Sequence, residues 1–258
     1  MDTRTLSQQA LAIIDSYIHF RLGNAVCSVP YFNNKKTRTR AGLRAQIGKG
    51  RSNEIFDEIH AIVVKNHIVP ETLADESLKK LLVENNLGIE CSGFAYYIFD
   101  AENRHRNFGP LDKRLRFINC RGLVARLRCS LRPVENCDVA TMSDNANSHT
   151  IPLNDLKPGD MITMRGNSEK AESDHILVIH QIDYKNKLPH IVHYSHAIAY
   201  PDDGLYGSGI RQGSIEVNNQ DSSIINGIWS ENGSIDAASQ LFARAQKSTT
   251  EVRRFNWF

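Results

Sequence analysis

Hydrophobic positions along the chain change from helical spacing in its first part to short strand-like runs in its second part. Apolar residues three or four positions apart predict helices over residues 8–22, 54–66 and 75–86, and one more that begins near Cys91. Short apolar runs bounded by turn residues predict strands over 161–164, 175–182, 190–197, 213–217 and 224–229, then a helix over 234–246 and an edge strand over 251–258. The pattern indicates an α+β fold.

The strand over 175–182 begins with a histidine and runs on without alternation. Ile-Leu-Val-Ile follows His175 directly, which is typical of a strand buried on both faces. On the next strand, period-2 geometry places His193 and Ser195 on one face and His196 on the other. We expect His193 or Ser195 to orient the His175 ring.

A Cys-Ser-Gly-Phe run begins at Cys91, directly after the Leu87-Gly88 break that ends the preceding helical pattern. In the first turn of a helix, unpaired backbone N–H groups and the helix dipole favour a thiolate. Ser92 and Gly93 are small, which leaves room for a substrate carbonyl and for an oxyanion beside backbone N–H groups. Cys91 is therefore a candidate nucleophile, and a buried, inert cysteine is the alternative.

The order of these segments resembles the NlpC-type papain-like cysteine peptidases, which are cell-wall endopeptidases and amidases related to the CHAP amidases. The resemblance covers residues 88–197: Cys-Ser-Gly-Phe opening a helix, Leu-Lys-Pro-Gly-Asp before a strand, a histidine opening an apolar strand, and a polar residue on the next strand. It implies a papain-like fold with Cys91 as nucleophile, His175 as general base and His193 as the third member. It also implies hydrolysis of an amide bond in a peptide or peptidoglycan fragment through a thioester, with no metal and no other cofactor.

Two departures from the family pattern concern Glu90 and a tyrosine. Glu90 stands where the family usually has Asp, which is a mild chemical change. The family's oxyanion-stabilising Tyr, about a dozen residues before the cysteine, is missing, and Tyr31 in a Pro-Tyr context is the nearest candidate. The resemblance also predicts a division into a helical N-terminal extension over residues 1–70 and a hydrolase domain over 71–258. An insertion at about 101–150 would form a lid, a specificity element or a small subdomain.

Composition sets the outer limits of this interpretation. With 258 residues, 41% of them hydrophobic, the chain can bury a large core. Its five cysteines are an odd number without C-x-x-C spacing, so the sequence indicates neither a zinc site nor a disulfide framework, and it favours a reducing interior. No apolar run is long enough for a signal peptide or a membrane span, which predicts a cytoplasmic protein. A wall-degrading activity would then require export by a non-classical route or phage lysis.

Charge is nearly balanced at +2 but unevenly distributed. Basic residues cluster over 35–51 and again over 104–132. Such clusters favour an anionic wall polymer or, as the alternative function, nucleic acid bound without catalysis; solvated helix faces explain them equally well. An acyltransferase on the same fold is a further alternative, because it begins with the same acyl-enzyme. Tyr206 and Trp229 suit either stacking against a ligand or packing in the core.

Overall fold

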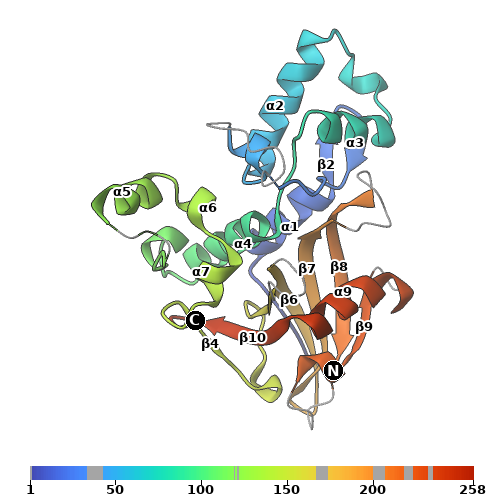
Figure 1. Ribbon diagram of the computed structural model, residues 1–258. Helices are drawn as coiled ribbons and strands as arrows, with labels where there is room; N and C mark the ends of the chain where they lie inside the picture. Colours follow the sequence, from blue (N-terminus) through green and yellow to red (C-terminus); the bar gives the residue numbers. More distant parts are fainter. Residues whose placement is uncertain are drawn as a thin grey trace.

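The structure is a computed structural model that describes residues 2–33, 43–118, 120, 122–166, 174–199, 207–217, 223–231 and 235–258. It combines helices with one large antiparallel sheet (Figure 1), so the predicted α+β class is confirmed. The strand order is β4-β10-β5-β6-β7-β8-β9, and β1 also pairs with β6. These strands are β1 (Asp2–Thr5), β4 (Ser148–Thr150), β5 (Met161–Arg165), β6 (His175–Lys185), β7 (Leu188–Ile198), β8 (Gly209–Glu216), β9 (Ile228–Glu231) and β10 (Thr249–Phe255).

The C-terminal strand β10 lies inside the sheet, between β4 and β5. The prediction of an edge strand is therefore wrong, because the short β4 covers the outer side of β10. The strand predicted over 224–229 also differs: a 3-10 turn, Ile224–Asn226, comes first, and β9 follows it.

Hydrophobic cores lie on both faces of the sheet, as the unbroken apolar run in β6 predicts. Ile176 and Val178 join the core beneath α1 (Gln8–Ile18) and α4 (Cys91–His105). Leu177 and Ile179 join the core beneath α9 (Ile235–Lys247). Successive residues of β6 therefore point toward different helices.

The N-terminal residues belong to the main body, so the predicted division at residue 70 is wrong for them. Strand β1 pairs with β6, and the Tyr17 ring of α1 meets the Phe94 ring of α4 edge-on at 5.4 Å. Ser7 caps α1, but the helix predicted over 8–22 ends at Ile18 because the following residues form a hairpin that turns at Gly23. The hairpin and two helices form the upper part of Figure 1: β2 (Phe20–Leu22), β3 (Ala25–Cys27), α2 (Ser52–Lys65) and α3 (Asp75–Glu84).

The predicted insertion begins later than residue 101, because α4 continues to His105. It contains the short helices α5 (Leu123–Leu131), α6 (Pro133–Asn136) and α7 (Val139–Ser143), and α5 lies at the edge of the molecule (Figure 1). The remaining described turns are 3-10 helices: Arg44–Ile47, Pro70–Thr72, Leu111–Lys113 and Leu153–Asp155.

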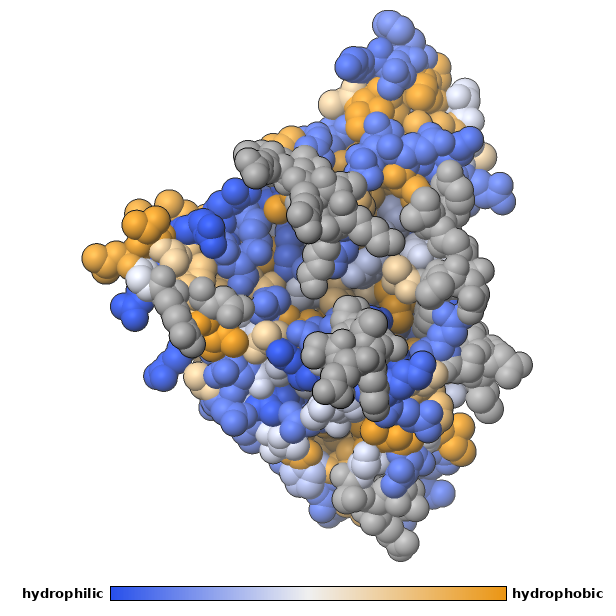
Figure 2. Space-filling model, in the orientation of Figure 1, coloured by the Kyte–Doolittle hydropathy of each residue, from blue (hydrophilic) through white to orange (hydrophobic). Residues whose placement is uncertain are grey.

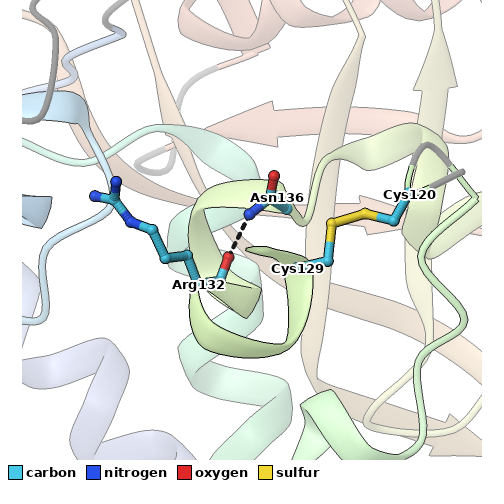
Figure 3. The surroundings of a disulfide bond; sticks show 4 residues. All are labelled: Cys120, Cys129, Arg132 and Asn136. Carbon is cyan, nitrogen blue, oxygen red and sulfur yellow. Dashed lines mark hydrogen bonds between the residues drawn. A yellow bond between two sulfur atoms is a disulfide. The ribbon is translucent and has the colours of Figure 1, made fainter. Parts of the chain in front are cut away.

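Cys120 and Cys129 form a disulfide that ties the start of this insertion to α5 (Figure 3). Cysteine spacing did not predict this bond, because the two cysteines are nine positions apart and only the fold brings their Cα atoms to 6.4 Å. Among the described helices, none is long and apolar enough to cross a membrane.

Candidate functional site

Cys91 is the first residue of α4, as predicted, and its side chain is buried. Glu90 occupies the N-cap position with extended backbone geometry, and its side chain makes no capping hydrogen bond to the helix backbone. Gly93, in the first turn, lies close to the preceding chain: a Cβ there would be 3.0 Å from the Gly48 carbonyl oxygen. Only glycine fits this contact without displacing its neighbours.

A buried lysine holds the residues around the helix N-terminus. Lys49 Nζ lies 2.6 Å from Glu90 Oε1 and donates hydrogen bonds to Ser92 Oγ and the Cys137 carbonyl, each at 2.7 Å. The Ser92 hydroxyl in turn donates to Glu90 Oε1 at 2.6 Å. Ser92 was predicted as an oxyanion or substrate contact, but its hydroxyl is engaged in this network. Its role here is to fix the turn that presents Cys91.

The environment of Cys91 favours the neutral thiol. Burial raises the pKa of Cys91 to about 11, and Glu90 adds to the shift. Lys49, Arg244 and the backbone N–H of Ile176 act against it by stabilising the thiolate. The contribution of the Ile176 amide indicates that the sulfur lies near the second residue of β6.

His175 is buried at the start of β6 and leads into a chain of buried polar groups. His175 Nε2 lies 2.8 Å from His196 Nδ1, and His196 Nε2 lies 2.7 Å from Glu231 Oε1. Both His196 and Glu231 are completely inaccessible to solvent. The Glu231 carboxylate also forms an ion pair with Arg211 at 3.4 Å.

We assign the ring protons of this chain from its hydrogen-bond partners. An ionised carboxylate only accepts hydrogen bonds, so His196 Nε2 is the N–H that donates to Glu231. In the tautomer that leaves His196 Nδ1 without a proton, this nitrogen accepts from the N–H at Nε2 of His175. His175 keeps its lone pair at Nδ1, which is what a general base needs. Burial lowers the pKa of His175 well below 6.5, and the nearby Arg244 and His196 lower it further, so the ring is neutral.

The structure does not bring His193 to His175, and the prediction that His193 orients the base is wrong. His193 Nε2 contacts Asp183 Oδ2 at 2.9 Å, and Ser195 Oγ contacts His180 Nδ1 at 3.0 Å. The two faces of β7 were assigned correctly. The wrong step was the face assigned to His175, which lies on the same face as His196. Ser195 therefore does not orient the His175 ring either.

No hydrogen bond joins Cys91 to His175 within the part of the chain that is described. Cys91 belongs to the core that contains Ile176, whereas His175 shares the opposite face with His196. The two side chains therefore meet the end of β6 from different sides.

Tyr31 lies beside the nucleophile despite its distance in sequence. It forms a parallel β-bridge with Ile89, and the neighbouring Pro30 carbonyl accepts a hydrogen bond from the Ile89 amide at 3.0 Å. Burial raises the pKa of Tyr31, and the negative charge of a Cys91 thiolate raises it further. Its hydroxyl is thus a protonated donor near the sulfur, as an oxyanion-stabilising tyrosine would be.

Three residues of this site were missed by sequence reasoning: His196, Glu231 and Arg244. Arg244, in α9, lies close enough to influence the pKa of Cys91, Tyr31 and His175. Only His196 had a signal in the sequence, as a histidine on the strand next to His175. Glu231 and Arg244 belong to no motif and reach the site through folding alone.

Other candidate features do not add ligands. No three His, Cys, Asp or Glu side chains of the described ranges are grouped as a metal site needs. Trp229 packs in the core beneath α9, whereas Tyr206 and residues 35–40 of the first basic cluster lie outside the described residues. In the second cluster several basic side chains pair with neighbouring acids: Arg104 with Asp100, Arg106 with Glu102, and Arg132 with Glu135.

Comparisons with family models, with curated proteins and with solved structures find no match to this chain.

Proposed function

We propose that this chain is a cysteine hydrolase that cleaves an amide bond through a thioester acyl-enzyme. Cys91 is the nucleophile, His175 the general base, and His196 with Glu231 the groups that orient it. The observation that carries the proposal is the buried His175–His196–Glu231 chain, which begins one residue from the Ile176 amide that influences the Cys91 sulfur.

The reaction begins with a neutral pair rather than a stored ion pair. The raised pKa of Cys91 and the lowered pKa of His175 both favour uncharged forms. As the sulfur attacks the carbonyl carbon, the thiol proton moves to His175 Nδ1, which requires the His175 side chain to turn toward Cys91 in the substrate complex. His175 then protonates the leaving amine. A water molecule, deprotonated by the same nitrogen, hydrolyses the thioester and releases the carboxylic acid.

The transition state carries negative charge on the former carbonyl oxygen. Backbone N–H groups in the first turn of α4 have no intrahelical acceptor and can bind this oxygen. Tyr31, protonated and near the sulfur, supplies a second donor. Lys49 and Glu90 neutralise each other and hold the turn in place, so they contribute position rather than net charge.

The substrate class rests on the resemblance of residues 88–197 to the NlpC-type peptidases, a papain-like family that acts on peptides of the cell wall. Acyl transfer to an amine remains the alternative within the same chemistry, because only the acceptor of the acyl group differs. Binding of nucleic acid without catalysis gains no specific support, since the acid pairs of Arg104, Arg106 and Arg132 reduce the charge available to phosphates.

The test compares Cys91→Ala with Cys137→Ala, which removes another buried cysteine. Purified peptidoglycan sacculi are incubated with each folded protein, and released peptides and new amino groups are measured. We expect Cys91→Ala to be inactive and Cys137→Ala to retain activity. Release of peptides by folded Cys91→Ala at the wild-type rate would overturn the proposal.

A further inference from the structure

Helix α5 exposes an apolar stripe at the edge of the molecule. Its side chains are among the most exposed large hydrophobic groups described: Leu123 and Val124 are each 85% exposed, Leu127 is 62% and Leu131 is 69%. Figure 2 shows this hydrophobic area at the protruding end where Figure 1 places α5. Exposed apolar residues that occur singly need no explanation, but four on one short helix form a surface patch.

The four side chains lie on one side of the helix. At 3.6 residues per turn they fall within an arc of about 100°, the width of an apolar helix face. Cys129, at the opposite side, is buried and bonded to Cys120, so the disulfide holds the helix with its stripe outward (Figure 3). Exposed Arg126 and Arg128 lie on the two flanks of the stripe.

Basic residues predominate in the sequence around α5. Between Asp112 and Glu135 the sequence contains no acidic residue but seven arginines and lysines. Lys113 and Arg132 pair with these two flanking acids, whereas Arg126 and Arg128 are exposed beside the stripe. An apolar stripe bordered by cations matches a surface that combines an apolar interior with negative headgroups. If a second copy of this chain packed on the stripe, the same cations of both copies would face each other. A peptide partner would need a groove to bind in, whereas the exposed helix α5 is a convex surface.

We propose that α5 docks the protein on a bilayer that contains anionic phospholipid. The nine-residue helix is too short to span a membrane and would lie in the interface, with its apolar stripe among the acyl chains. Arg126 and Arg128 would remain at headgroup level and contact lipid phosphates.

The test is sedimentation of the full chain with vesicles of phosphatidylcholine alone or with about one third phosphatidylglycerol. We expect binding only to the anionic vesicles. Val124→Ser or Leu127→Ser should weaken it at least about tenfold, because each removes a large part of the apolar contact. Arg126→Gln and Arg128→Gln should each weaken it about fivefold, and added salt should reduce the contribution of both.

Val64→Ser is the matched control, since Val64 is also an exposed valine on a helix, at 58%. It should bind like the wild type, and all the variants should keep their thermal unfolding midpoints because the altered groups are exposed. Equal binding by Val124→Ser and Val64→Ser, or no binding of the wild type to anionic vesicles, would refute the proposal. Self-association that Val124→Ser abolishes without any vesicle binding would assign the stripe to a second copy. Cys91→Ala should bind vesicles normally, so this result is independent of the catalytic proposal.

Discussion

Replacing Glu231 by Gln tests whether the buried carboxylate stabilises the charge that forms on His175 during proton transfer. The amide keeps the size of the side chain, and its oxygen can still accept the hydrogen bond from His196 Nε2, so the tautomers are retained. What the variant loses is the negative charge. Two hydrogen bonds of 2.8 and 2.7 Å and one imidazole ring separate His175 from Glu231.

These distances put the two charges roughly 8 Å apart, which corresponds to about 2 kcal/mol at an effective dielectric constant near 20. We therefore expect Glu231→Gln to lower the rate of peptide release from sacculi by about 30-fold. The assay is the initial rate at neutral pH, measured together with thermal unfolding, because the variant also removes the ion pair with Arg211.

Asp183→Asn is the matched control on the other face of the sheet. It removes a carboxylate charge from a histidine in the same way, at the 2.9 Å contact between Asp183 and His193. This pair makes no contact with His175, so turnover should stay within about twofold. Equal losses in the two variants, or a loss in Glu231→Gln that follows its fraction unfolded, would refute the role assigned to Glu231.

Three further outcomes follow from the same geometry. His196→Ala should reduce turnover by on the order of a hundredfold or more while His193→Ala stays near wild type, and the reverse ranking in folded proteins would contradict the contacts of His175. The acidic limb of the rate profile should lie well below pH 6.5, because the lowered pKa keeps His175 neutral there, and a limb near pH 6.5 would show a normal histidine. The free energy of unfolding should decrease as pH falls below 6.5, since the unfolded chain binds that proton first. Peptide mapping without reductant should recover the Cys120–Cys129 disulfide, and Cys129→Ser should lower stability by about 3 kcal/mol or less by chemical denaturation, whereas two free thiols in the mapped protein would exclude the bond.

The local features of the site could be predicted from sequence alone. Cys91 at the start of a helix follows from the break at Gly88 and the helical spacing after it, and these signals involve only neighbouring residues. His175 at the start of a strand buried on both faces follows from the unbroken apolar run behind it. Alternation along the next strand correctly separated His193 from His196.

Only the tertiary structure decided which of these residues meet. Because both faces of β6 are buried, hydrophobicity does not reveal which residues of β7 lie on the same face as His175. The pairing of Val178 with Ser195 puts His175 on the face of His196. Glu231 and Tyr31 arrive from segments far away in sequence, through the β8–β9 pairing and the bridge to Ile89. Such contacts depend on long-range strand pairing, which short sequence patterns do not determine. Helix starts and strand burial, in contrast, depend on residues that are adjacent in the sequence.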